Sequence, residues 1–137
     1  MRYDFSLIYQ LCGELGLSAH SHDERCVEID LGPAGSLCFQ NAENDEDCLI
    51  GFRGTPWHTH DDLTFDGHGH YIELSYLDML SGLKDGRVLV CERLIEDRLV
   101  DRWLIHRDYN DELKDMDAGE QIIVRRVTTR APAGSQT

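Results

Sequence analysis

The chain has 137 residues, of which 41% are hydrophobic and 28% are charged. This composition is typical of one globular domain with its own core, and it excludes a disordered chain. The formal net charge of −13 predicts repulsion from nucleic acid and anionic lipid, which are polyanions, and attraction to a protein partner with a basic surface.

The sequence also bears on the cellular compartment. No apolar run approaches the roughly 18–20 residues of a membrane span, and residues 1–16 lack the apolar core of a signal peptide. The five cysteines are far apart, without a C-x-x-C pair, and an odd number of them favours reduced thiols. We therefore expect a cytoplasmic protein that does not bind membranes.

The negative charge is concentrated in the first half of the chain. Residues 1–70 contain 13 acidic side chains and three arginines, for a net charge of −10. Residues 71–137 contain 13 acidic and ten basic side chains, for a net charge of −3. A basic partner should therefore be attracted mainly to the first half.

The first half of the chain predicts one helix followed by strands. Residues 4–16 have apolar side chains at helical spacing, and Gly16 is a typical helix end. Apolar and acidic residues then alternate between Val27 and Phe39 around a GPAG turn, which predicts a β-hairpin. After an acidic loop, residues 48–54 are expected to form a third strand.

The second half predicts a helix and three further strands. Residues 71–86 carry a broad apolar face, which is typical of a helix that packs on a sheet. Residues 87–95 and 98–106 are expected to pair through a turn at Glu96 and Asp97. A short polar segment leads to a last strand at 120–128. We expect one domain over residues 1–130 and a flexible tail at 131–137.

Short connections between consecutive strands indicate an α+β fold. We expect a mainly antiparallel sheet of about five to six strands, with two helices packed on one face. The residues expected to form its core are Val27, Ile29, Leu31, Leu37, Phe39, Ile50, Phe52, Leu74, Leu77 and Leu80.

The segment TPWHTHDDLTFDGHGH, residues 55–70, contains two His-x-His pairs. In an extended segment residues i and i+2 point to the same side, so each pair can converge on one point. Four imidazoles would suit Zn²⁺ and could support metal-dependent hydrolysis. This alternative interpretation assigns the zinc ligands to His58, His60, His68 and His70. The other interpretation is a structural or recognition loop without a cofactor.

No catalytic motif stands out, because the chain has no nucleophile elbow, P-loop or dinucleotide-binding glycine motif. In size, charge and expected architecture it resembles the immunity proteins of bacterial polymorphic and contact-dependent toxin systems. That resemblance implies an inhibitor, not an enzyme, which blocks the basic active-site cleft of a toxin with acidic loops and an aromatic anchor. The partner-binding residues expected on this basis are Glu43, Asp45, Glu46, Asp47, Trp57, Asp61 and Asp62.

Overall fold

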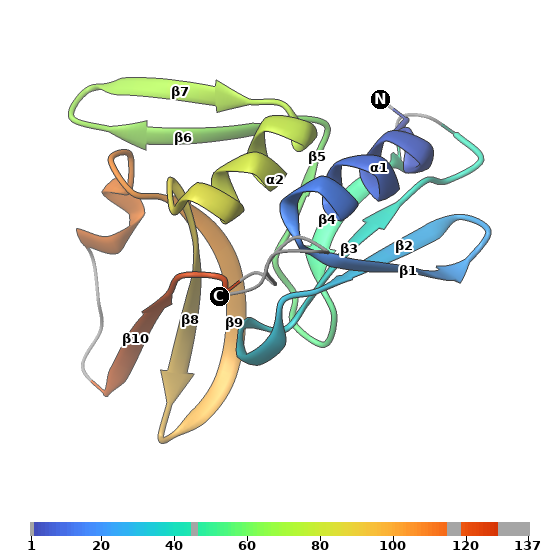
Figure 1. Ribbon diagram of the computed structural model, residues 1–137. Helices are drawn as coiled ribbons and strands as arrows, with labels where there is room; N and C mark the ends of the chain where they lie inside the picture. Colours follow the sequence, from blue (N-terminus) through green and yellow to red (C-terminus); the bar gives the residue numbers. More distant parts are fainter. Residues whose placement is uncertain (1, 45–46, 115–118, 129–137) are drawn as a thin grey trace, which may run out of the picture.

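A computed structural model describes residues 2–44, 47–114 and 119–128 (Figure 1). The predicted tail at 131–137 lies outside these residues. In chain order the elements are α1 (Phe5–Leu15), β1 (Ser18–Asp23), β2 (Cys26–Asp30), η1 (Gly32–Ala34), β3 (Ser36–Gln40), β4 (Leu49–Phe52), β5 (His58–His60), β6 (Leu63–Gly67), β7 (His70–Leu74), α2 (Tyr76–Asp85), β8 (Val88–Ile95), β9 (Arg98–His106), η3 (Asp111–Lys114) and β10 (Glu120–Arg125).

The predicted α+β class is confirmed, and the paired strands are antiparallel. The strands are divided among three sheets with the orders β1-β2-β3-β4-β5, β10-β8-β9 and β6-β7. Helix α1 packs against β1 and α2, and α2 also packs against β7 and β8 (Figure 1). Within the described residues, no helix has the length and apolar character needed to cross a membrane.

Each helix begins and ends at residues that satisfy its terminal backbone groups. At α1, the Asp4 side chain accepts a hydrogen bond from the Leu7 N–H at 3.1 Å, and Gly16 ends the helix with φ 76°. At α2, the Ser75 hydroxyl oxygen accepts from the Asp78 N–H at 3.1 Å. The expected start of this helix at residue 71 was wrong, because residues 70–74 pair with β6 as strand β7.

Two segments without a clear apolar pattern form strands. Residues 18–23, which carry almost only exposed side chains, form the edge strand β1 by pairing with β2. The His-rich stretch is not a loop, because His58–His60 pairs with β4 and residues 63–74 form the β6-β7 hairpin. Both segments therefore form strands because they pair with neighbouring strands, and not because their own residues are apolar.

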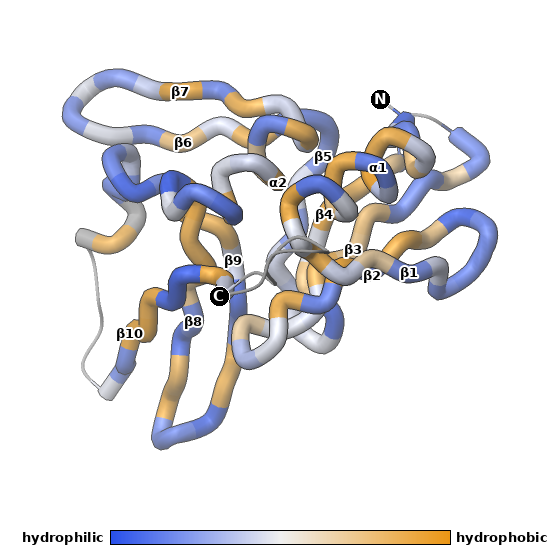
Figure 2. Tube along the Cα trace, in the orientation of Figure 1, coloured by the Kyte–Doolittle hydropathy of each residue, from blue (hydrophilic) through white to orange (hydrophobic). Residues whose placement is uncertain are grey.

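The core agrees with the sequence expectation except at one residue. The inward faces of β2, β3 and β4 are buried, as are Leu74 and Leu80, whereas Leu77 is only half-buried. Met79 and Leu83 occupy the core beside Leu80. Figure 2 shows apolar segments along α1 and the hydrophilic turn between β1 and β2.

A buried carboxylate joins the three strands of the β10-β8-β9 sheet. Glu92 of β8 is 3% exposed and accepts hydrogen bonds from Arg102 at 2.7 Å and from Arg125. Burial alone would raise the pKa of Glu92, but the hydrogen bonds from the two guanidinium groups outweigh it and lower the pKa. Arg102 also reaches the turn after η1, where a Cβ on Gly35 would lie 2.8 Å from its Nη1. The three-stranded sheet is thereby held against the five-stranded one.

Replacing Leu80 with Ala should reduce the free energy of unfolding by about 2–5 kcal/mol, because it leaves a cavity in a fully buried position. Leu77→Ala, on the same helix but half-buried, is the matched control and should cost clearly less. Urea denaturation of the two variants measures the difference. Equal losses would contradict the orientation of α2.

Candidate functional site

Acidic side chains gather at one end of the five-stranded sheet. The register aligns Cys26, Gln40, Leu49 and His60 in one row across β2 to β5. The β1-β2 turn, the β3-β4 loop and the β5-β6 turn therefore lie at the same end of the sheet, beyond that row. We call this region the acidic end, and its described acidic residues are Asp23, Glu24, Glu43, Asp47, Asp61 and Asp62. Among the described residues of these three connections, Arg25 is the only base.

Tyr3 holds two of these connections in place. Its backbone N–H donates to Asn41 Oδ1, and the Asn41 side-chain amide donates to the Tyr3 carbonyl, both at 2.8 Å. The Tyr3 hydroxyl donates to the Asp61 carbonyl at 3.3 Å. Burial raises the pKa of Tyr3, and the nearby Asp61 raises it further, so the hydroxyl stays protonated and keeps donating. The acidic end is thus attached to a buried aromatic side chain.

The predicted partner-binding residues fall into two groups. Glu43 and Asp47 lie at the acidic end together with Asp61 and Asp62, and all but the half-buried Asp62 are exposed. Glu43 pairs with Arg25 at 3.0 Å. Asp45 and Glu46 lie outside the described residues. Trp57 precedes β5 and therefore lies at the opposite end of that strand.

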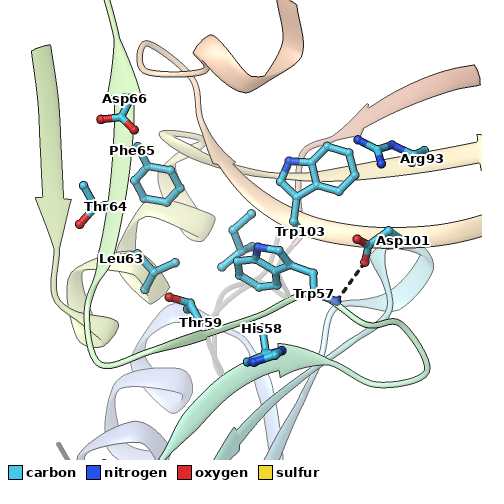
Figure 3. A pocket seen from close by; sticks show the side chains of 11 residues that line it. Trp57, His58, Thr59, Leu63, Thr64, Phe65, Asp66, Arg93, Asp101 and Trp103 are labelled. Atoms are coloured by element: carbon cyan, nitrogen blue, oxygen red, sulfur yellow. Dashed lines mark hydrogen bonds between the residues drawn. The ribbon is translucent and has the colours of Figure 1, made fainter. Parts of the chain in front are cut away.

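Trp57 lines a cavity of about 450 Å³ between β5, β6 and β9 (Figure 3). Its ring packs against Phe52 at a centroid distance of 6.0 Å. Its backbone N–H donates to Asp101 Oδ1 at 3.1 Å, and the same oxygen accepts the Arg102 N–H at 2.9 Å. Asp101 therefore fixes the segment that carries Trp57 to strand β9. We call this cavity the Trp57 pocket.

Strand β9 supplies a second tryptophan to the pocket. Trp103 follows Asp101 by two residues and lies on the same face of the strand. The guanidinium of Arg93 lies over the Trp103 ring, 5.2 Å from its centroid. Arg93 also pairs with Glu120 at 3.8 Å. The pocket wall thus already contains a cation stacked on an aromatic ring.

The β6 wall of the pocket is held by aromatic packing. The Phe65 ring lies 5.8 Å from His106, which lies 5.2 Å from Tyr109. Gly67 follows two residues later, and a Cβ there would meet the Tyr109 Cα at 2.7 Å. Phe65 and Gly67 are buried, so the alternation of the strand exposes Asp66 between them. Figure 3 shows Asp66 and Asp101 on opposite sides of the aromatic rings.

The structure does not bring the four histidines together. His58 and His60 lie side by side on β5 with ring centroids 5.4 Å apart. Each Nδ1 faces a carbonyl oxygen, of Pro56 at 3.1 Å and of Cys48 at 2.9 Å, so each Nδ1 donates and Nε2 is left as the atom that could bind a metal.

The second pair, His68 and His70, lies at the β6-β7 turn. Among the described residues, no group of three or more His, Cys, Asp or Glu side chains is arranged to hold a metal. The four histidines do not form one such group among the described residues, and zinc binding by them stays a prediction.

A polar cluster on the outer face of the five-stranded sheet is saturated by its own contacts. Glu28 is 5% exposed and pairs with Arg53 at 2.8 Å and with His20 at 3.2 Å. Cys38 donates to the same carboxylate at 3.8 Å. Burial raises the pKa of the Cys38 thiol to about 12, so it is not a thiolate nucleophile at neutral pH.

A scan of the chain against models of protein families found no match, and searches of curated proteins and of solved structures found none either.

His106 should make folding stability pH-dependent. Burial lowers its pKa below the ordinary value of 6.5, and Asp108 opposes this only in part. Its Nδ1 accepts the Asp108 N–H at 3.0 Å, which requires the neutral ring. Because the unfolded chain binds this proton more readily, the free energy of unfolding should fall as the pH drops below about 6.5.

Urea denaturation between pH 5.5 and pH 8 tests this expectation. In His106→Gln the free energy of unfolding should change less with pH below about pH 6.5 than it does in the wild type. This holds whatever the effect of the substitution on stability at pH 8. His68→Gln serves as the matched control for losing an exposed histidine. If His106→Gln left the pH dependence of the free energy of unfolding unchanged, the conclusion that His106 is buried as a neutral imidazole would be wrong.

Proposed function

We propose that the protein is a small acidic cytoplasmic binding protein, an immunity-type inhibitor that neutralises a bacterial toxin by covering its basic active-site cleft. The observation that carries this proposal is the acidic end, where three connections present six described carboxylates and the nearby bases are Arg25 and Arg2. Such a surface is complementary to a cleft that binds an anionic substrate.

The arginines of the chain do not offset this charge, because many of them pair with other carboxylates. These ion pairs are Arg53–Glu28, Arg87–Asp85, Arg102–Glu92, Arg107–Asp108 and Arg125–Glu92. The acidic end is therefore left with its own surplus of negative charge. Charge of one sign on one side of a protein steers an oppositely charged partner and raises its rate of encounter.

The displaced pKa values also favour binding over catalysis. Active sites commonly contain ionisable groups with shifted pKa values. Here the groups whose pKa values are shifted include Tyr3, Cys38, Glu92 and His106, and each is engaged in a structural contact described above. None of them lines the Trp57 pocket.

The acidic end and the Trp57 pocket are close enough to belong to one interface. They are separated along β5 by three residues, which is about 10 Å of strand. A standard interface covers about 800 Å² on each partner and could include both. We therefore assign steering to the acidic end and anchoring to the aromatic pocket.

Identifying the genes beside this chain, and co-expressing it with any toxin that they encode, tests the proposal. Cells that express the toxin should survive only when this protein is present, and the purified pair should form a stable complex. Absence of both protection and binding would refute the inhibitor function.

Association of that pair should slow steeply as the ionic strength rises from 0.01 to 0.1 M, because the Debye length falls from about 30 to about 10 Å. Glu24→Gln/Asp47→Asn, at the acidic end, should lower the association rate at low salt by about threefold. Glu96→Gln/Asp97→Asn removes the same charge from the β8-β9 turn and is the matched control. Equal rates for both double variants, measured by stopped flow, would show that the acidic end does not steer.

A further inference from the structure

Strand β10 lies at the edge of the three-stranded sheet (Figure 1). It pairs with β8 on one side, and no strand among the described residues pairs with it on the other. In an antiparallel sheet, every second residue of an edge strand directs its N–H and C=O groups outward. A row of such groups can form hydrogen bonds with a strand of another chain.

Strand β10 lacks the features that commonly prevent edge strands from pairing, which are bulges, prolines, lysines and short length. At the other edges of the two larger sheets, β5 has three residues, and the pairings of β1 and β9 are each irregular at one point. By contrast, β10 keeps a regular register with β8 over six residues. Its sequence, EQIIVR, contains neither proline nor lysine.

The middle of this edge is apolar. Ile122 and Ile123 are half-buried, and Val124 is 46% exposed. Ile122 packs against the smaller buried cluster, which contains Trp103, so the strand is held in place by the core of its own sheet. A regular, apolar edge of this kind tends to pair with another strand, either in a specific complex or by aggregation.

The two ends of β10 carry opposite charges. Glu120 begins the strand, whereas Arg125 ends it and Arg126 follows. Glu120 pairs with Arg93 at 3.8 Å. Arg126 is exposed, and none of the ion pairs among the described residues uses it. Residues 120–126 contain one acidic and two basic side chains, so this edge does not share the net charge of −13 that makes two copies of the chain repel each other elsewhere.

We infer that two copies of the chain pair antiparallel through β10 and join their three-stranded sheets into one continuous sheet. A second copy fits this edge because the acidic end of each strand then lies beside the basic end of the other. This inference goes beyond the proposed function, since no residue of β10 lines the Trp57 pocket or belongs to the acidic end.

The two-fold symmetry of such a dimer restricts which residues meet. An axis perpendicular to the sheet keeps each face on its own side, so residues that lie opposite each other have to share a face. An axis through Ile123 meets this condition and places Ile122 opposite Val124 of the second copy. The same axis places Glu120 opposite Arg126 of the second copy. Apolar side chains therefore meet in the middle of the pair, and opposite charges meet at both ends.

Analytical ultracentrifugation tests the dimer in the full-length protein at about 0.15 M salt, where a Debye length of about 8 Å limits the repulsion between the chains. Association should be reversible and should stop at two chains. Hydrogen exchange at low and high protein concentration locates the interface, since amides of residues 120–126 should exchange more slowly in the dimer and those of edge strand β1 should not change. A mass of one chain at every concentration, growth beyond two chains, or protection confined to segments other than β10 would overturn the inference.

Two variants of β10 test the contacts. Val124→Lys places a charge in the middle of the edge and should raise the dissociation constant of the dimer by about tenfold, because the change occurs twice in each dimer. Arg126→Glu, which puts a second acid beside Glu120, should also weaken the dimer. The matched control is Val100→Lys, since Val100 is also exposed but lies on β9 at the opposite edge of the same sheet. Wild-type affinity in both β10 variants, or equal weakening in Val100→Lys, would contradict the proposed pairing.

Discussion

The hydrogen bond from the Trp57 backbone N–H to Asp101 is the constraint on which the candidate site depends. It joins the segment before edge strand β5 to edge strand β9 of another sheet, across 44 residues of sequence. With this bond in place, Trp57 packs against Phe52 and its ring lines the pocket. A half-buried carboxylate that accepts two backbone N–H groups is a strong and directional attachment.

The β6-β7 hairpin completes the site from a third sheet, and here the attachment is packing rather than charge. Phe65 contacts His106, and Gly67 allows the backbone to approach Tyr109 more closely than any side chain would permit. Because His106 is buried as a neutral ring, protonating it in acid should weaken the packing that holds the hairpin. The hydrogen bond to Asp101 does not involve a histidine. The pocket is thus a junction of three strand edges held by two independent contacts.

Local sequence patterns could predict the elements but not this junction. The helical spacing of Phe5, Ile8 and Cys12, with Asp4 before and Gly16 after, was sufficient for α1. The Glu96-Asp97 turn was predicted because two residues separate two strand patterns, and in the structure both residues adopt the positive φ that a two-residue hairpin needs. Strands β1 and β5 are short or polar and exist through pairing, so their own residues carried little signal. The interpretation of the histidines as one zinc site assumed that the segment between the pairs folds back, whereas β6 carries the second pair away from the first.

Steering and anchoring are different physical problems, and the fold solves them in different places. Long-range attraction needs unpaired charge and no defined geometry, so turns and loops at the end of a sheet are adequate for the acidic end. A short-range anchor needs side chains whose positions are already fixed before the partner arrives, because ordering them on binding costs conformational entropy. Trp57 meets that need, since its backbone N–H is bound to Asp101 of β9 and its ring packs against Phe52. Changes at the acidic end should therefore act on association, and changes in the pocket should act on the lifetime of the complex.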